Sequence, residues 1–231
     1  TAFLYGFAER ETINDIFEDI CGARFTTSYT RIGGLMADMP DGWANKVKRF
    51  CGGLPKTLDE LVALLNRNRI FVERTKGVGV LSHDEAIAWG VTGPLARASG
   101  VRRDLRKDEP YLCYADNWDG KKSSPVRFKV PIAQGGDVYA RYLVRLEEIR
   151  QSLVIIEQLI DNVPPGAINV LPNDKMVLPD KSEVHDSIEG LIHHFEQIMT
   201  NRGHQPPVGE AYGANETANG ELGFYLVSDG G

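Results

Sequence analysis

The stretch GGDVYARYLVRLEEIRQSLVIIEQLIDNV, residues 135–163, decides the fold of this sequence. Its apolar side chains recur at steps of three and four residues, a spacing that places them on one face of an α-helix. This apolar seam consists of Tyr139, Tyr142, Leu146, Ile149, Leu153, Ile156, Ile160 and Val163. Asp137 is a candidate N-cap and two prolines follow Val163, so we predict a long helix over residues 137–163 with the seam in a core. The first half is charged and the second half is apolar on nearly all sides, so we expect the helix to pass from a surface or interface into that core.

The composition is that of a globular protein with a sizeable core. The 231 residues are 42% hydrophobic and 25% charged, which suits one large or two small domains. A net charge of -6 provides no positive field to gather nucleic acid, so we expect no nucleic-acid partner. No apolar run is long enough to span a bilayer, and no N-terminal signal pattern is present. The chain stops just past a predicted strand, which suggests a fragment of a longer protein.

The cysteines indicate a reducing compartment. Cys21, Cys51 and Cys113 are odd in number and far apart in the sequence. This pattern argues against a disulfide framework and against an iron–sulfur cluster held by this chain alone.

Capping and breaker signals predict further helices along the chain. They are a helix over 1–21 ended by Gly22, a short helix after Asp41, a helix opened by a capping box at Thr57–Glu60, a helix opened by a capping box at Ser82–Glu85 and ended by Gly90, a short helix from Gly93–Pro94, and a helix from Asp180 with Val184, Ile188, Leu191, Phe195 and Ile198 on one seam. The fold class predicted from this pattern is α+β and predominantly α-helical.

Two regions lack the helical pattern. Residues 101–134 are rich in charges, prolines and aromatics, so we predict a long functional or interface loop with an exposed tip at 119–125 and a short strand at Val126–Val130. Asn219-Gly220 lies between two strand-like runs, a strong signal for a β-hairpin. We therefore divide the chain into a helical core over 1–200 and a β-hairpin segment over 201–231.

Two motifs that suggest ligand sites are better explained as structure. Gly77-x-Gly79-x-x-Ser82 resembles a dinucleotide-binding loop after a possible strand at 70–74, but the third glycine and a following acid-ended strand are missing, so an ordinary tight turn is favoured. His193 and His194 are adjacent on a helix and point about 100° apart, which does not suit a shared metal. We interpret them as a hydrogen-bonded structural pair.

Charged residues suggest a scaffold rather than a reaction centre. A local basic cluster contains Arg97, Arg102, Arg103, Arg106 and Lys107. A solvated face paired with neighbouring acids is the favoured interpretation, and an interface with an acidic partner or anionic lipid headgroups is the alternative. On the long helix, Arg141, Arg145, Glu147 and Glu148 predict a structural ion network. No catalytic residue and no metal site is predicted in this range.

Ordered motifs along the whole chain resemble a known family. The first motifs are Gly22-Ala23-Arg24, Arg31-Ile-Gly-Gly34, Asn68-Arg69-Ile70, Arg74-Thr-Lys-Gly-Val-Gly79, Gly93-Pro94, Ser99-Gly100, Asp104-Leu-Arg106-Lys107 and Pro110-Tyr111. They continue with Gly136-Asp137-x-Tyr139-x-Arg141-Tyr-x-x-Arg145-x-Glu147-Glu148, Ile192-His-His-Phe195 and Gly220-Glu221-x-Gly223-x-Tyr225-Leu-x-Ser228-Asp229-Gly230. In this order they resemble the D subunit of respiratory complex I, the NADH:quinone oxidoreductase.

The resemblance implies a helical core like that of the nickel–iron hydrogenase large subunit, with a C-terminal β-hairpin. It also implies a proton-translocating enzyme of the respiratory chain, peripheral on the cytoplasmic side of a bacterial inner membrane. The expected partners are the iron–sulfur small subunit, the C subunit and the membrane-embedded H subunit of complex I. Quinone is the expected substrate, no cofactor is expected in this chain, and the iron–sulfur cluster is expected in the small subunit.

The resemblance places the quinone pocket between the D subunit and the iron–sulfur small subunit, with the residues that hold the quinone headgroup outside this range. Arg31, Arg69 and Arg74 lie in family motifs at loops and helix ends, so they are expected near the quinone cavity or its charge relay. The sequence departs from the family in a longer loop at Asp116–Ser124, and in Ala140 where the family often has Asp.

Two alternative functions remain at this stage. The large subunit of a membrane-bound, energy-converting nickel–iron hydrogenase shares several of the same stretches. A non-catalytic scaffold of the same fold is the other alternative. Because the chain holds neither a redox centre nor the headgroup ligands, we expect the isolated chain to be inactive as a quinone reductase.

Overall fold

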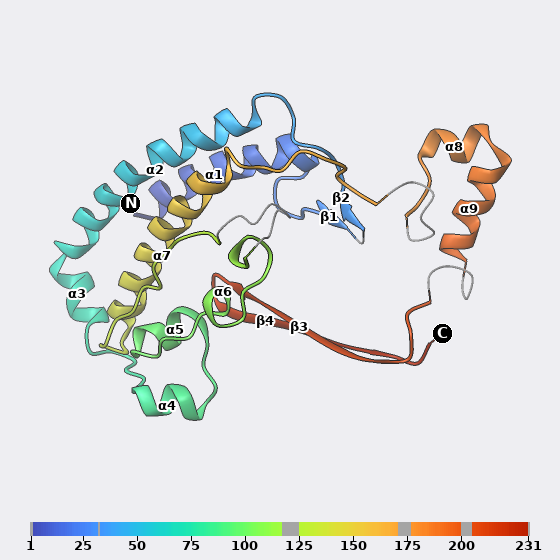
Figure 1. Cartoon of the computed structure of the whole chain (residues 1–231). Coiled ribbons are helices and arrows are strands. Elements are labelled where there is room, and N and C mark those ends of the chain that lie inside the picture. The colour runs from blue at the N-terminus through green and yellow to red at the C-terminus, as the bar shows by residue number, and fades with distance from the viewer. Residues whose placement is uncertain (1, 32, 117–124, 171–176, 200–204, 231) are drawn as a thin grey trace. The chain divides into compact units, whose positions relative to one another are not determined.

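A computed structural model describes residues 2–31, 33–116, 125–170, 177–199 and 205–230 of the chain. About half of the chain is helical, and an antiparallel β-hairpin lies near the C-terminus (Figure 1). Within the described ranges, no helix is both long enough and apolar enough to cross a membrane. The chain divides into two compact units, the first made of Thr1–Thr12, Ala44–Pro164 and Gly213–Phe224, the second of Ile13–Trp43, Pro165–Tyr212 and Tyr225–Gly231.

Most helices of the structure lie in or enter the first unit. They are α1 (Ala2–Cys21), α2 (Trp43–Asn66), α3 (Arg69–Thr75), α4 (His83–Ala88), α5 (Gly93–Ala98), α6 (Leu105–Asp108), the short 3-10 helix η1 (Leu112–Tyr114) and α7 (Val138–Leu159). Gly22, in the left-handed region at φ 72°, follows the end of α1 as predicted.

Helix α7 begins as predicted and ends early. The Asp137 carboxylate caps it by accepting a hydrogen bond from the Ala140 amide at 2.7 Å. The helix ends at Leu159, so the prediction of helix as far as Val163 is wrong at this end. Val163 precedes a proline, whose ring disfavours helical backbone in the residue before it.

The predicted apolar seam of α7 is only partly right. Leu146 and Leu153 are buried, but Ile149 is 39% exposed and Val163 is 52% exposed. A second side of the helix is buried as well, because Ala140 and Val144 pack against Ala98 of α5. Small side chains let the two helices approach closely, and small residues carry no strong hydrophobic signal in the sequence.

Helix α2 is continuous where the sequence predicts two helices. It runs through Pro55, and the predicted capping box at Thr57–Glu60 is not formed. The Thr57 hydroxyl instead donates a hydrogen bond to Glu9 Oε1 on α1 at 2.7 Å. A tertiary contact has therefore replaced the local cap.

The region 101–134 contains α6 and η1 in addition to loop. The predicted strand at Val126–Val130 is absent from the described part of this region (125–134), where the backbone is irregular. The amide of Arg127 donates to Gln158 Oε1 at 3.0 Å and the amide of Lys129 donates to Gln151 Oε1 at 2.9 Å. Side-chain amides of α7 thus replace a neighbouring strand. Most of the predicted tip, residues 117–124, lies outside the described residues.

The capping box before α4 is confirmed. The amide of Glu85 donates to Ser82 Oγ, while the Glu85 carboxylate accepts from the Ser82 amide. Gly90 follows in the left-handed region at φ 62°, and a proline opens α5 as predicted. The segment interpreted as a possible strand at 70–74 belongs to α3, whose N-cap is Asn68.

In the second unit, the short strands β1 (Thr30–Arg31) and β2 (Gly34–Leu35) pair antiparallel. The helix predicted from Asp180 is broken at Ser187 into α8 (Lys181–Asp186) and α9 (Ile188–Ile198). Ser187 ends α8 and also caps α9, accepting a hydrogen bond from the Gly190 amide. Gly190 allows this break because a Cβ there would lie 2.4 Å from the Glu183 carbonyl oxygen.

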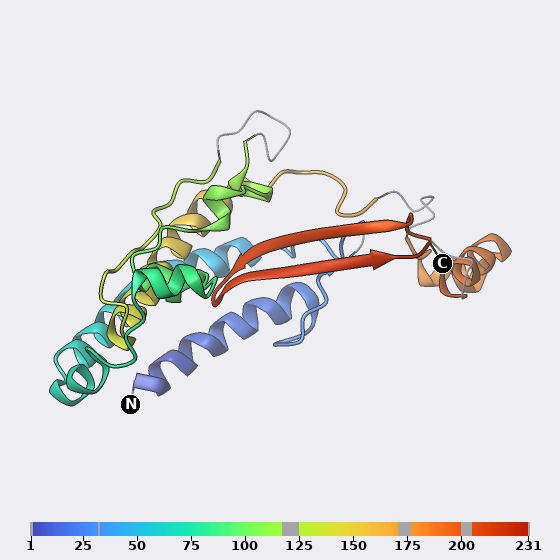
Figure 2. The ribbon, with the colours of Figure 1, turned by 90° about the horizontal axis from the view of Figure 1, so that it is seen from below.

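The predicted hairpin is confirmed as β3 (Gly209–Thr217) and β4 (Gly220–Ser228), drawn as two long ribbons of opposite direction in Figure 2. Asn219 lies in the turn and Gly220, at φ 134°, begins β4. Leu222, Phe224 and Leu226, at alternate positions of β4, are all exposed.

Candidate functional site

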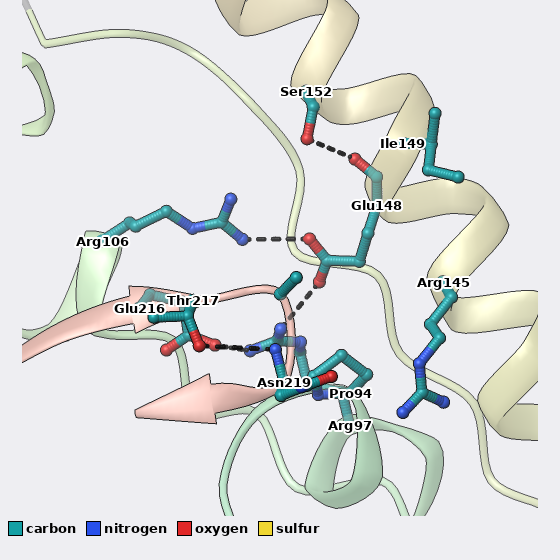
Figure 3. Close-up of a pocket in the computed structure, with 11 residues that line it drawn as sticks. Pro94, Arg97, Arg106, Arg145, Glu148, Ile149, Ser152, Glu216, Thr217 and Asn219 are labelled. Carbon is teal, nitrogen blue, oxygen red and sulfur yellow. Dashed lines mark hydrogen bonds and ion pairs between the residues drawn. The ribbon is translucent and has the colours of Figure 1, made fainter. Parts of the chain in front are cut away.

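The largest concentration of buried charge in the described residues lies in the first unit, where α5, α6, α7 and the hairpin turn meet (Figure 3). A cavity of about 480 Å³ opens beside it. The cavity is lined by Pro94, Arg97, Arg106, Arg145, Glu148, Ile149, Ser152, Glu216, Thr217, Ala218 and Asn219. We call the ion-paired groups Arg97, Asp104, Arg106, Glu148 and Glu216 the buried network.

Arg97 is the centre of the buried network, and its side chain is 1% exposed. Its Nη1 lies 2.8 Å from Glu216 Oε1 and 3.0 Å from the Arg103 carbonyl oxygen. Its Nη2 lies 2.9 Å from Glu148 Oε1, at an angle outside that of a hydrogen bond. A single guanidinium therefore joins α5 to α7 and to β3.

Arg106 supplies the second cation. Its Nε and Nη2 donate to the two carboxylate oxygens of Asp104 at 2.9 and 2.6 Å, and its Nη2 also donates to Glu148 Oε2 at 3.1 Å. The guanidinium carbon lies 4.7 Å from the centre of the Phe128 ring. Burial lowers the pKa of Arg106, but the hydrogen bonds and charges of Asp104 and Glu148 outweigh burial and raise it above its ordinary value.

Asp104 serves both the helix and the network. Its side chain accepts a hydrogen bond from the Arg106 amide at 3.0 Å and so caps α6. Its Oδ2 lies 3.7 Å from Arg97 Nη1, so the same carboxylate faces both arginines. Placing an acid at this N-cap fixes the position of α6 relative to α5.

Glu216 attaches the hairpin to the helices. Besides its pair with Arg97, it accepts a hydrogen bond from the Leu105 amide at 3.3 Å, while its own amide donates to the Tyr111 hydroxyl at 3.0 Å. The turn sits close to α5, because a Cβ on Gly220 would lie 2.6 Å from Thr92 Oγ1. The hairpin turn is thus held by a buried carboxylate and by a close backbone approach that requires glycine.

The charge balance of the buried network indicates a structural role. Arg97 and Arg106 face three carboxylates, those of Asp104, Glu148 and Glu216. Arg145 lines the same cavity and donates to the Arg141 carbonyl oxygen at 3.4 Å. Ion pairs this well buried hold elements in fixed positions, and loss of one partner costs roughly 3–5 kcal/mol. The arrangement is therefore suited to holding α5, α6, α7 and β3 in position rather than to catalysing a reaction.

The basic cluster of the sequence is therefore not one solvated face. Arg97 and Arg106 are buried, whereas Arg102, Arg103 and Lys107 are exposed. The prediction of a solvated face is wrong for the two buried arginines. Their carboxylate partners on α7 and β3 are distant in the sequence and leave no local pattern.

The four residues predicted to form an ion network on α7 are separated by the structure. Glu148 lies in the buried network, whereas Glu147 accepts from Gln151 Nε2 at 2.9 Å and lies 3.6 Å from Arg150 Nη1. Arg141 donates to the carbonyl oxygens of Gly79 and Gly136. The sequence analysis missed Arg97, Asp104, Arg106 and Glu216 as network members. The position of Asp104 at the N-cap of α6 was a local signal for one of them.

The residues predicted near a quinone cavity lie apart in the chain. Arg31 is on β1 of the second unit and lines a cavity of about 600 Å³ with acidic Asp180 and Glu183. Arg69 is exposed on α3 and pairs with Glu73 at 2.7 Å, and Arg74 lies in the last turn of the same helix. Their predicted role near a cavity or charge relay stays a prediction.

The histidine pair lies on α9 in the second unit. The His194 ring meets Phe195 edge-on with ring centres 6.3 Å apart. Across the described residues, no group of three His, Cys, Asp or Glu side chains is placed to hold a metal ion.

Comparison with known proteins identifies related sequences along the whole chain. The family model described as "Respiratory-chain NADH dehydrogenase, 49 Kd subunit" matches residues 1–231. The chain is 49% identical to the C/D subunit of the NADH-quinone oxidoreductase of Bdellovibrio bacteriovorus, with 100% of this chain and 39% of that protein covered. It is 48% identical to the D subunit of the same enzyme of Akkermansia muciniphila, with 100% and 53% covered, and 47% identical to the first of the D subunits of Opitutus terrae, with 100% and 52% covered. The chain thus spans about half the length of the D subunits, and less of the C/D protein.

Proposed function

The chain belongs to the family of the 49 kDa subunit of respiratory-chain NADH dehydrogenase, and we propose that it works as part of the D subunit of a NADH:quinone oxidoreductase. The observation that carries the proposal is the family match over residues 1–231, together with relatives at 47–49% identity that are named as subunits of this enzyme. The hydrogenase alternative is not favoured by this match.

In this proposal the chain helps to form the pocket in which quinone is reduced, beside a small subunit that carries an iron–sulfur cluster. The C subunit and the membrane-embedded H subunit are the other proposed neighbours, on the cytoplasmic side of a bacterial inner membrane. The proposed fold is the helical core of a nickel–iron hydrogenase large subunit. No cofactor is assigned to this chain.

The reaction consists of two electrons from the partner's cluster and two protons reaching one quinone to give the quinol. The chain contributes rigidity to this reaction rather than a reacting group. The buried network supports this role, because Arg97 and Glu148 join α5 and α7 while Glu216 holds the hairpin turn against them. A pocket wall built on these elements keeps its shape through the redox cycle.

The proposal is tested with the full-length gene in its own host. Deletion should abolish NADH-driven quinone reduction by membranes, and the wild-type gene on a plasmid should restore it. Arg97→Met should restore it poorly, whereas Arg69→Gln, a change at an exposed pair, should restore it fully. Membranes of the deletion strain that reduce quinone at the wild-type rate would overturn the proposal.

A separate prediction concerns the 231-residue chain alone. We expect no quinone reduction by the purified chain with NADH or with a chemical electron donor, because no redox group is assigned to it. The measurement is quinol formation by absorbance, with the assembled enzyme as positive control. Turnover by the chain without partners would contradict the prediction.

A further inference from the structure

The middle of helix α2 contains residues that weaken an α-helix. Gly52 and Gly53 lie in the helix interior, where glycine loses more backbone entropy on folding than any other residue. Pro55 has no N–H to donate to the Cys51 carbonyl oxygen, and its ring crowds that carbonyl. We call residues 51–55 the weak segment of α2.

The surroundings of the two glycines do not require glycine. Both glycines have helical backbone. Among the described residues, a Cβ on Gly52 or Gly53 would come within 4 Å of no atom beyond the adjacent backbone of α2. At Gly93, in contrast, a Cβ would lie 2.4 Å from the backbone of Gly220. The glycines of α2 therefore weaken the helix without relieving a close contact, and a glycine pair next to a proline is typical of places where helices bend.

The weak segment lies beside a cavity of about 290 Å³ between α2 and α7. Val47 and Cys51 are buried, at 8% and 3% exposed, and both line this cavity. Leu54 and Leu58 are buried to the same degree, at 8% and 3% exposed, and lie outside the cavity lining. The part of α2 before Gly52 is therefore less closely packed against α7 than the part after it.

Ion pairs join α2 to α7 on both sides of the weak segment. Lys48 pairs with Asp161, and both residues line the cavity. Asp59 pairs with Arg150 at 3.1 Å. All four side chains are at least 40% exposed, and exposed pairs contribute little to stability. The pair of Lys48 can therefore break and form again while Leu54 and Leu58 hold the second part of α2 in place.

We propose that α2 bends at the weak segment and that this bend opens and closes the cavity against α7. In the closed arrangement, seen in the structure, Lys48 pairs with Asp161 and the Cys51 thiol is buried. In the open arrangement the pair is broken and the thiol is exposed to solvent. The inference goes beyond the proposed function, because it concerns a motion within the chain itself.

Hydrogen exchange of the full-length protein tests the bend. Protection factors of the amides in 51–57 should be at least about tenfold lower than those in 47–50 and 59–64 of the same helix, because the weak segment opens locally. Gly52→Ala/Gly53→Ala should raise protection in 51–57 by about tenfold or more, because alanine favours helix and both sites have room for a Cβ. The matched control is Gly6→Ala, at a glycine inside α1 with equally open surroundings, which should leave protection in 51–57 unchanged.

Labelling of the Cys51 thiol tests the opening of the cavity. With the other cysteines replaced by serine, a small thiol reagent reaches Cys51 when the cavity opens. The labelling rate should fall by about tenfold or more in Gly52→Ala/Gly53→Ala, since the stiffer helix opens less often. Gly6→Ala raises helix propensity elsewhere, so it should leave the labelling rate unchanged and exclude a general gain in stability as the cause.

Two results would overturn the proposal. One is protection in 51–57 of the wild type that equals protection in the flanking turns. The other is equal labelling of Cys51 in the wild type and in Gly52→Ala/Gly53→Ala. If the double variant unfolds at a lower temperature than the wild type, Pro55→Ala takes its place, because it restores the missing N–H donor and should likewise raise protection. These measurements need no quinone reduction, so the proposed function is tested separately.

Discussion

Arg97 and Arg69 make ion pairs of almost equal length in very different surroundings. Arg97 Nη1 lies 2.8 Å from Glu216, and Arg69 Nε lies 2.7 Å from Glu73. The side chain of Arg97 is 1% exposed, whereas that of Arg69 is 88% exposed. For an exposed pair, the attraction between the two charges is offset by the loss of hydration and of side-chain entropy. When one partner of a buried pair is removed, the other remains as an unpaired charge in a poorly polarisable medium, which is costly. Burial rather than distance therefore decides what each pair contributes.

The largest expected effect is at the centre of the buried network. Arg97→Met should lower the free energy of unfolding by about 3–5 kcal/mol, because Glu216 and Glu148 lose the cation between them. Denaturant unfolding followed by circular dichroism measures the change. A loss under about 1 kcal/mol would place this pair with the exposed ones.

Apolar burial on α7 gives the next contrast. Leu153→Ala should cost about 2–5 kcal/mol of stability, because Leu153 is 6% exposed and its truncation leaves a cavity. Ile149→Ala, one turn earlier and 39% exposed, should cost clearly less. The two variants share one measurement, the midpoint of denaturant unfolding. If the two variants lost equal stability, Ile149 would contribute as much to the core as Leu153, and α7 would present a different face to the core.

The contribution of the buried Asp137 carboxylate to stability should depend on pH. Burial raises the pKa of its carboxyl, but hydrogen bonds from the Gly77 and Ala140 amides and the charge of Arg141 outweigh burial and lower the pKa below its ordinary value. A carboxyl with a lowered folded-state pKa stabilises the fold above its unfolded pKa of about 3.9, and this contribution is lost as the pH falls through the lowered value. Asparagine can still cap the helix, so Asp137→Asn removes only the charge that strengthens these hydrogen bonds and attracts Arg141. The substitution should therefore cost about 1 kcal/mol at pH 7 and little at the lowest pH at which the chain stays folded.

The control for this prediction is Asp180, which caps α8 through the Ser182 amide and is exposed. Asp180→Asn removes a charge at a cap that holds no second loop. A loss for Asp137→Asn that is the same at pH 7 and at low pH would show that the carboxylate charge does not contribute to holding Gly77 and the residues after it on α7.

Local signals explain which parts of the fold the sequence predicted. The caps at Ser82 and Asp137 and the turn at Asn219-Gly220 were predicted because each depends on residues a few positions apart. The capping box at Thr57 failed because Glu9, 48 positions away, takes the hydroxyl. A contact at that separation has no signature in a single sequence.

The candidate site was less predictable for the same reason. Arg97 and Glu216 are 119 positions apart, and Arg106 and Glu148 are 42 apart. In the sequence the arginines lie among Asp104, Asp108 and Glu109, which favoured a solvated face. Glu148 was correctly recognised as a charged residue on α7, but its partners come from α5 and α6 rather than from its own helix.

The smallest expected effect is at the exposed pair. Arg69→Gln removes an i, i+4 ion pair on α3 that is open to solvent on both sides, so the free energy of unfolding should change by at most about 0.5 kcal/mol. The difference from wild type should disappear in about 1 M salt, where exposed charges are screened within about 3 Å. Arg97→Met should keep most of its effect in the same salt, because ions do not enter a site that is 1% exposed. If salt removed both effects equally, the network around Arg97 would be open to solvent, and the contrast between the two pairs would be lost.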